Sequence, residues 1–124
     1  MTARVLAVID RDCPGTEDMR DPLYFCVGVR AQFGGVDLVL RGSAVPSALV
    51  AANGPAHRKN NDAQPSNPQR YVRALVRAGV RVWVDEADLA ERLHTDQTLI
   101  DGVLTADTDA LATRWHEYEE VWFL

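Results

Sequence analysis

Three short apolar runs rich in β-branched residues constrain the fold of this chain more than any other feature. They span residues 4–9 (RVLAVI), 36–40 (VDLVL) and 80–84 (VRVWV). Each run has the length of a buried strand, and helix-like segments lie between them. Strands that alternate with helices are typical of a parallel sheet covered by helices on both faces. The sequence therefore predicts a single three-layer α/β domain over residues 1–124, with a mostly parallel five-stranded sheet.

Helix signals fill the segments between these runs. Asp21-Pro22 and Asn67-Pro68 each place a cap residue before a proline at the first helical position. The polar stretch Gly54–Ser66 is predicted to be a mobile loop. The remaining patterns predict helices or helical turns at Val45–Ala52, Ala87–Leu93, Thr98–Asp101 and Thr108–His116, and short strands at Val103–Thr105 and Glu119–Leu124.

Composition excludes several classes of function. The formal net charge of −5 argues against a nucleic acid partner, since phosphate binding needs a basic surface. No apolar run approaches the roughly 18 residues of a membrane-spanning helix, so we expect a cytoplasmic protein without a membrane partner. His57, His94 and His116 lack partners at helical spacing, and we expect no metal or other cofactor. Cys13 and Cys26 are too few for a disulfide framework and are expected to be free thiols.

The segment from Ala78 to Val103 runs from an apolar strand through a polar exit at Asp85 into a helix, and it ends in the letters IDGV. This layout resembles the DsrE/DsrF-like family of small sulfur-relay proteins, of the DsrE/TusD/YchN type. Members of that family place a cysteine that carries persulfide sulfur directly after such a strand. In this chain Asp85 stands there. The closing segment, residues 102–124, is similar to the family's final strand–helix–strand.

The resemblance implies a flavodoxin-like or DsrEFH-like fold and a homo-oligomer, a trimer or hexamer. It also implies a place in intracellular sulfur trafficking beside other sulfur-relay proteins. The family's catalysis is not expected at Asp85, because a carboxylate offers no sulfur nucleophile. The chain is therefore interpreted as an accessory or binding member of the family rather than as a working sulfurtransferase.

Polar residues follow each of the three apolar runs. In open parallel sheets, ligands bind outside the carboxyl ends of the strands, near the point where the strand order reverses. With a flavodoxin-like order, the first strand and the strand at residues 80–84 are neighbours there. The candidate site then combines the residues that leave the strands: Asp10, Arg11, Asp12 and Cys13 after the first, Arg41 and Ser43 after the second, and Asp85 and Glu86 after the third.

Asp85 has two interpretations. As the N-cap of the following helix it needs no further function, because Asp is a preferred cap residue. As a fixed carboxylate in a pocket with Asp10 and Arg41, it could belong to a small-molecule or anion-binding site, or act as a base in a hydrolase. Both interpretations remain open from the sequence.

Cys13 is the remaining candidate for thiol chemistry. It lies in a polar loop directly after the first strand, where an exposed thiol could carry persulfide sulfur. Asp10 and Asp12 would raise its pKa and lower its reactivity, while Arg11 would partly offset them. A persulfide carrier or sulfurtransferase that uses Cys13 is therefore the catalytic alternative. Cys26 lies on an apolar helix stripe and is predicted to be a core residue.

The last strand is apolar on both faces. Val121 and Phe123 would face one side of the sheet, and Trp122 and Leu124 the other. Such a strand is either buried inside the sheet or lies at an edge covered by another subunit. The sequence is consistent with both.

Overall fold

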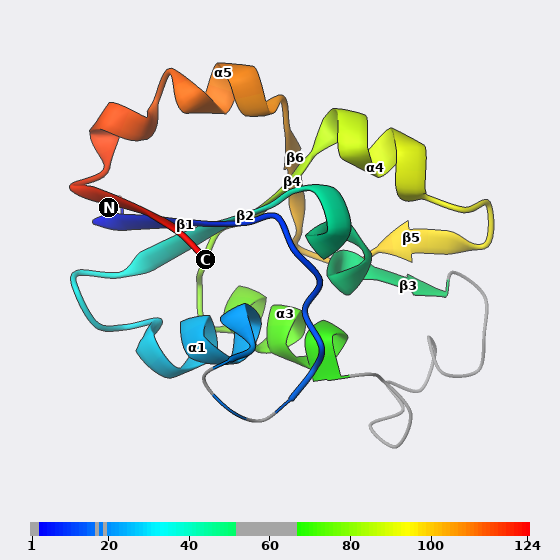
Figure 1. The fold of residues 1–124 in the computed structure, drawn as a ribbon, viewed down its shortest axis with the longest axis horizontal. Coiled ribbons are helices and arrows are strands. Elements are labelled where there is room, and N and C mark those ends of the chain that lie inside the picture. Colours follow the sequence, from blue (N-terminus) through cyan, green and yellow to red (C-terminus); the bar gives the residue numbers. More distant parts are fainter. Residues whose placement is uncertain (1–2, 17, 19, 52–66) are drawn as a thin grey trace.

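Parallel strands form the central sheet of the protein, whose computed structural model describes residues 3–16, 18, 20–51 and 67–124. The sheet has five strands in the order β6-β4-β2-β1-β7, and every neighbouring pair is parallel (Figure 1). The predicted fold class is therefore confirmed. The strands are β1 (Val5–Ile9), β2 (Val36–Leu40), β4 (Val82–Asp85), β6 (Leu104–Ala106) and β7 (Glu120–Phe123).

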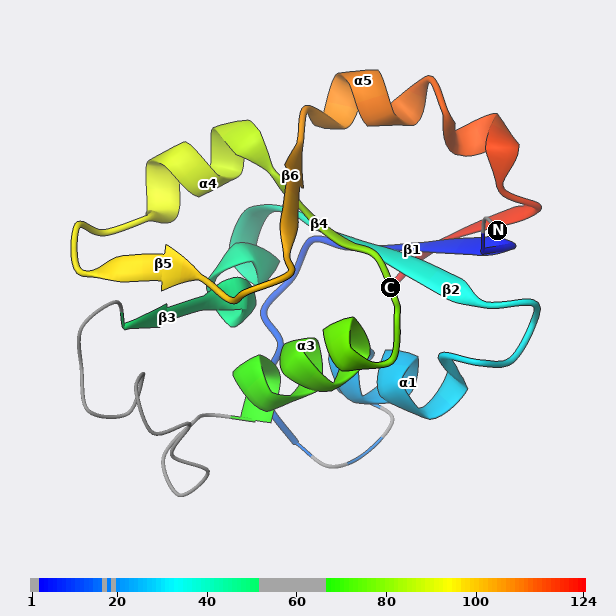
Figure 2. The ribbon, with the colours of Figure 1, turned by 180° about the vertical axis from the view of Figure 1, so that it is seen from behind.

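Helices cover both faces of this sheet. Helices α1 (Pro22–Val29) and α3 (Asn67–Arg77) lie together on one face, and α4 (Glu86–Arg92) and α5 (Thr108–Ala112) lie on the other (Figures 1 and 2). Helix α1 begins where the sequence predicts, because the buried Asp21 carboxylate accepts a hydrogen bond from the backbone N–H of Leu23 at 2.9 Å.

The segment after β2 differs from its prediction. Instead of the helix expected at Val45–Ala52, a 3₁₀ helix η1 (Gly42–Ala48) leads into a strand, β3 (Leu49–Ala51). Strand β3 pairs antiparallel with β5 (Gln97–Leu99), so the helical turn expected at Thr98–Asp101 is also wrong. Pro46 lacks the N–H that an α-helix would use, and each three-residue strand forms only because its distant partner is present.

The order of the strands also differs from the flavodoxin-like one. Strand β2 lies between β1 and β4, so β1 and β4 are not neighbours. The chain steps outward from β1 through β2 and β4 to β6, and the crossover through α5 then returns it to the far side of β1 as β7. The reversal of strand order therefore lies between β1 and β7.

Smaller differences concern the element ends. Helix α1 ends at Val29. The helix predicted over Thr108–His116 is divided into α5 and the 3₁₀ helix η2 (Trp115–Glu117). The predicted loop Gly54–Ser66 lies outside the described residues. Within the part of the chain that the structure describes, no helix is both long and apolar enough to span a bilayer.

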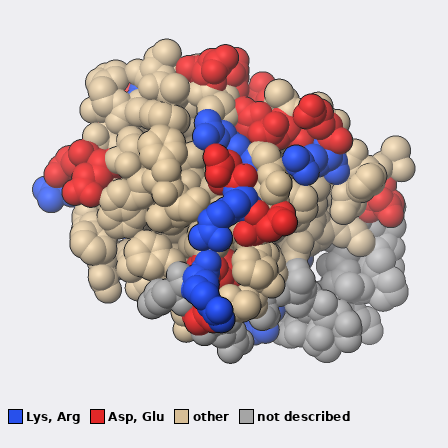
Figure 3. All heavy atoms as spheres, in the orientation of Figure 1, with Lys and Arg blue, Asp and Glu red and all other residues tan. Residues whose placement is uncertain are grey.

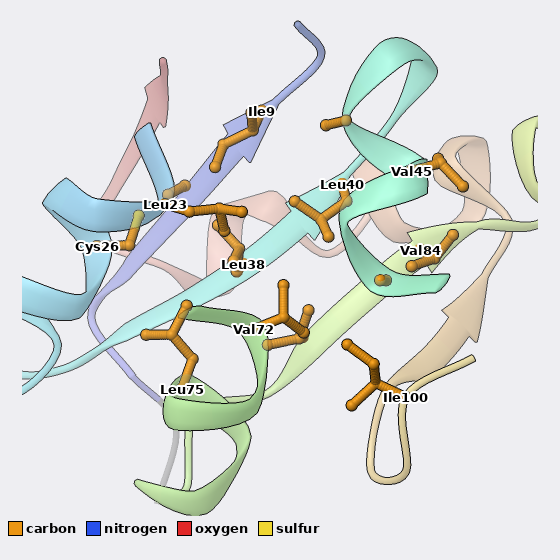
Figure 4. Close-up of a cluster of buried hydrophobic side chains, with 14 of the residues drawn as sticks. Ile9, Leu23, Cys26, Leu38, Leu40, Val45, Val72, Leu75, Val84 and Ile100 are labelled. Atoms are coloured by element: carbon orange, nitrogen blue, oxygen red, sulfur yellow. The ribbon is translucent and has the colours of Figure 1, made fainter. Parts of the chain in front are cut away.

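The larger hydrophobic core lies between the sheet and the face covered by α1 and α3. Leu38 and Leu40 of β2 meet Leu23 of α1 and Leu75 of α3 there, all almost completely buried (Figure 4). Each such side chain stabilises the fold by roughly 1.5–3 kcal/mol relative to an exposed position. Cys26 also lies in this core, as predicted.

The opposite face has a smaller core, which includes Leu111 of α5 and Tyr118. It adjoins a buried polar cluster at the amino end of β2. The Asp37 side chain accepts a hydrogen bond from the Tyr118 hydroxyl at 2.9 Å and forms an ion pair with Arg81 at 3.1 Å. A buried carboxylate needs such partners. The hydrogen bond from Tyr118 also connects the segment before β7 to β2.

Candidate functional site

The carboxyl ends of β1, β2 and β4 face a hollow of about 350 Å³. Asp10, Arg41 and Asp85 are the residues that leave these strands, and all three line it. The structure thus brings together three of the eight residues of the predicted candidate site, even though β1 and β4 are separated by β2. The remaining lining residues are Gly42, Asp88, Thr108 and Asp109.

Asp85 joins two helix starts at this hollow. Its side chain accepts a hydrogen bond from the backbone N–H of Asp88 at 3.0 Å, which makes it the N-cap of α4. It also accepts hydrogen bonds from the backbone N–H of Thr108, at 3.1 Å, and from the Thr108 hydroxyl. Burial is the largest influence and raises the pKa of Asp85, but the hydrogen bonds from Thr108 and Asp88 outweigh it and leave this pKa below its ordinary value.

Asp88 connects the same helix to the segment after β2. Its carboxylate accepts a hydrogen bond from the backbone N–H of Gly42 at 2.8 Å. Gly42 has a φ of +53°, and a Cβ atom there would lie 3.3 Å from the carbonyl oxygen of Asp10. Glycine is therefore the residue that lets the β2 exit lie so close to the β1 exit.

The charge of the hollow is predominantly negative. Arg41 supplies its cationic group and lies 3.7 Å from the Asp10 carboxylate, while Asp85, Asp88 and Asp109 add further carboxylates. Figure 3 shows acidic and basic side chains side by side over the carboxyl ends of β1 and β2. The arrangement favours a ligand with a positively charged group over a simple anion.

The other predicted site residues do not line this hollow. Asp12, Cys13 and Ser43 line a second hollow of about 410 Å³, together with Pro14, Pro46, Ser47, Pro68 and Gln69. Arg11 is exposed and donates a hydrogen bond to the carbonyl oxygen of Arg20. Glu86 is an exposed residue of the first turn of α4 and lines neither hollow. The predicted single site is thus two neighbouring ones.

Cys13 is half-buried rather than exposed. Burial is the main cause that raises the pKa of its thiol to about 11, and a hydrogen bond with Ser47 offsets this in part. The signs predicted for Arg11 and Asp12 are confirmed, but both effects are smaller than that of burial. Burial likewise raises the pKa of Cys26 to about 12. Both thiols are therefore protonated near neutral pH and are weak nucleophiles there.

The sequence prediction missed Asp88, Thr108 and Asp109 in the first hollow, and Ser47 and Gln69 in the second. One signal was available for Asp88, since it stands three residues after a cap residue, where capping boxes place an acidic side chain. Thr108 had no comparable signal, because its contact with Asp85 depends on the pairing of β6 with β4, which places Ala106 opposite Asp85. Among the described residues, no cluster of three or more His, Cys, Asp or Glu side chains is arranged to hold a metal ion.

These features define the class of protein: a small three-layer α/β domain with a parallel five-stranded sheet and polar hollows at the carboxyl ends of its strands. Among solved structures, the YchN protein from E. coli matches with a TM-score of 0.73 and 20% sequence identity, over 99% of this chain and 100% of that one. MTH1491 from Methanobacterium thermoautotrophicum, a protein of unknown function, matches with a TM-score of 0.61 and 19% identity, over 99% and 100% of the two chains.

No protein-family model matches the sequence, and no curated protein sequence matches it either. At these identities the likeness to YchN and MTH1491 concerns the fold. It agrees with the fold that the resemblance to the DsrE/TusD/YchN type implied.

Proposed function

We propose that this protein is a DsrE/DsrF-like family member that acts as an accessory or binding protein in intracellular sulfur trafficking, without the cysteine–persulfide chemistry of that family. It works as a homo-oligomer in the cytoplasm, together with other sulfur-relay proteins. The shared fold with YchN over 99% of the chain supports this proposal. The strand-to-helix layout around Asp85, from β4 into α4, supports it further.

The hydrogen bonds of the Asp85 side chain are the main observation in support of the proposal. In the family layout, the residue after this strand holds the reactive sulfur. Here the Asp85 carboxylate accepts hydrogen bonds from Asp88 and Thr108 and stabilises the starts of α4 and α5. The position is therefore used to build the fold, and a carboxylate cannot form a persulfide.

A sulfur-uptake experiment tests this proposal. The purified protein is incubated with glutathione persulfide, and each cysteine-containing peptide is analysed by mass spectrometry for an added sulfur atom. We expect no added sulfur on the wild-type protein. The variant Asp85→Cys places a thiol at the start of α4, where a thiolate is stabilised, and we expect it to take up sulfur. Sulfur uptake by the wild-type protein would contradict the proposal.

The same experiment addresses the catalytic alternative, in which Cys13 carries the sulfur. That alternative requires sulfur on the Cys13 peptide of the wild-type protein and its loss in Cys13→Ser. The raised pKa of Cys13, about 11, argues against it, because very little thiolate is present near neutral pH.

A second candidate function is small-molecule binding in the hollow lined by Asp10, Arg41 and Asp85, which is favoured by the convergence of these three residues. The excess of carboxylates favours an amine-bearing ligand. Binding of an anion or a hydrolysable substrate in the same hollow would depend on the positive charge of Arg41. Thermal-shift titrations with ethylenediamine and with thiosulfate at low salt distinguish these charges. We expect ethylenediamine to stabilise the protein and Asp10→Asn to weaken the effect. Stabilisation by thiosulfate alone would reverse this preference.

A further inference from the structure

Strand β7 lies at one edge of the central sheet, and its outer side has no partner strand among the described residues. The backbone N–H groups of Glu120 and Leu124 donate to β1, to Arg4 and Val8 respectively. Because backbone groups alternate in direction along a strand, those of Val121 and Phe123 point away from the sheet. The sequence left two positions open for this strand, inside the sheet or at its edge. The structure places β7 at the edge.

Apolar side chains project from both faces of this edge. Val121 packs on the smaller core, and Trp122 and Leu124 pack on the larger one, as the alternation predicted. The Phe123 ring contacts Trp115 edge-on and remains 63% exposed. Natural edge strands are commonly protected by shortness, charged side chains, proline or a bulge. Strand β7 is four residues long and carries the exposed Glu120 at its start, but its apolar part, Val121 to Phe123, has no charge, proline or bulge.

A strained turn adds a further ring to the same edge. Phe33 has a φ of 55° and Gly34 a φ of 82°, and the N–H of Gly35 donates to the carbonyl oxygen of Gln32 at 2.9 Å. Positive φ at both central positions is the geometry of a type I′ turn, in which a bulky residue is unfavourable. Phe33 nevertheless occupies it, contacts Trp122 edge-on and remains 57% exposed. Retained backbone strain of this kind points to a functional surface.

We infer that the β7 edge, with Phe33 and Phe123 on its two faces, is the surface through which two copies of this chain associate. The inference rests on the proposed homo-oligomer and specifies its contact. Figure 3 shows a broad, largely uncharged region over β7 and α1. Each copy has a net charge of −5, so this region lets two copies meet without bringing their charges together.

The strand pattern specifies the geometry of this contact. Two β7 strands related by a twofold axis run antiparallel, and Val121 of one copy pairs with Phe123 of the other through the outward backbone groups. Trp122 then lies on the axis, opposite its own counterpart. Val121, Trp122 and Phe123 make β7 apolar on both faces beyond Glu120, so a second β7 strand provides apolar side chains above and below the pair.

The exposed area indicates how strong the contact is. An aromatic side chain buries 150–250 Å² when covered, so the exposed parts of Phe33 and Phe123 supply about 250 Å² per copy. A standard stable interface needs about 800 Å² per partner. The contact is therefore a small interface, and the fraction of dimer depends on the protein concentration. Hydrogen bonds between the two β7 backbones add to its stability.

Sedimentation equilibrium over a range of protein concentrations tests the surface. The variants are Phe33→Asn, which also suits a positive φ, and Phe123→Ser. The matched control is Leu104→Ser, because Leu104 is 43% exposed on β6 at the opposite edge of the sheet. We expect the wild-type protein and the control to dimerise equally, and each β7-edge variant to raise the dissociation constant about tenfold or more.

Hydrogen exchange on the wild-type protein provides a readout that needs no variant. We expect the amides of Val121 and Phe123 to become protected as the protein concentration rises, while those of β6 do not change. Association that is insensitive to the β7-edge variants, or protection confined to β6, would overturn this surface and leave the homo-oligomer intact. A wild-type protein that stays monomeric at all concentrations would overturn both, without affecting the sulfur-uptake result.

Discussion

The Asp85 carboxylate accepts hydrogen bonds from both the backbone N–H and the hydroxyl of Thr108, which lies 23 residues further along the chain. Since Asp85 also caps α4, one side chain stabilises the starts of two helices at the same edge of the sheet. This relationship explains why an acidic residue is suited to the end of β4.

Removal of this carboxylate should destabilise the fold. For Asp85→Ala we expect a loss of about 2–3 kcal/mol in the free energy of unfolding, from the lost cap and the lost hydrogen bonds of Thr108. Urea unfolding followed by circular dichroism measures it. The control is Asp107→Ala, which removes a cap from α5 alone and should cost about 1 kcal/mol or less. Equal losses in the two variants would contradict the double role of Asp85.

The contribution of Asp85 should disappear in acid. Its pKa is lower in the folded protein than in the unfolded chain, so its stabilising effect is complete above the unfolded value and is lost as the pH falls through the folded one. Asp85→Asn keeps a similar shape but does not titrate. The difference in unfolding free energy between the wild-type protein and this variant should stay constant from neutral pH to about pH 5 and shrink below about pH 4. A difference that grows in acid would contradict the lowered pKa.

Cys13 should react slowly with alkylating reagents. Its pKa of about 11 exceeds the ordinary value of 9.0 by about two units, which reduces the thiolate fraction near neutral pH about a hundredfold. Iodoacetamide labelling followed by peptide mass spectrometry measures the rate, with a free cysteine peptide as the reference. Ser47→Ala removes a hydrogen bond that lowers this pKa and should slow the reaction further. Cys26, with a pKa of about 12, should react more slowly than Cys13.

The hydroxyl of Tyr118 should matter more than a typical tyrosine hydroxyl. In Tyr118→Phe the buried Asp37 carboxylate loses one of its donors, and we expect a loss of about 1–3 kcal/mol in unfolding free energy. The matched control is Tyr24→Phe, since the partly exposed Tyr24 ring contacts Tyr71 edge-on and should change little. Burial and the hydrogen bond to Asp37 raise the pKa of Tyr118, so a spectroscopic titration should find it ionising at a higher pH than a free tyrosine does.

Two glycines should respond to alanine in opposite directions. Gly42 has a positive φ and its Cβ position lies 3.3 Å from the Asp10 carbonyl oxygen, so Gly42→Ala should cost about 1–2 kcal/mol. Gly28 lies inside α1, and apart from its chain neighbours and the backbone of its own helix, no atom of the described residues lies within 4 Å of its Cβ position. Gly28→Ala should therefore stabilise the protein by about 0.5–1 kcal/mol. Thermal unfolding distinguishes the two, and a neutral Gly42→Ala would show that the β2 exit adapts.

The local signals in the sequence were enough for the main elements. Strand β2 has the predicted bounds and β1 differs by one residue, because a short run of buried β-branched residues has few other ways to fold. Asp21 was predicted as a helix cap, and a cap was one of the two interpretations of Asp85, for a similar local reason: the hydrogen bond of a cap reaches only two or three residues ahead.

The candidate site was predicted only in part. Asp10, Arg41 and Asp85 follow strand ends, and the ends of parallel strands lie at one edge of the sheet, so their convergence follows from the fold class. Cys13 was placed in the same site because it follows the first strand. Its separation into a second hollow with Ser47 and Pro46 depends on η1, which only overlaps the helix predicted at Val45–Ala52.

The sequence by itself determined the alternation of strands and helices, the caps and the polar strand exits, because each of these depends on neighbours along the chain. Tertiary structure alone decided the pairing of β3 with β5, the position of β2 between β1 and β4, and the exposure of β7 at an edge. These features depend on contacts between segments that are distant in the sequence. Local sequence patterns do not predict the free energy of such contacts. The same holds for Asp85: its role as a cap is local, but its hydrogen bonds with Thr108 exist only because β6 pairs with β4 and places Ala106 opposite Asp85.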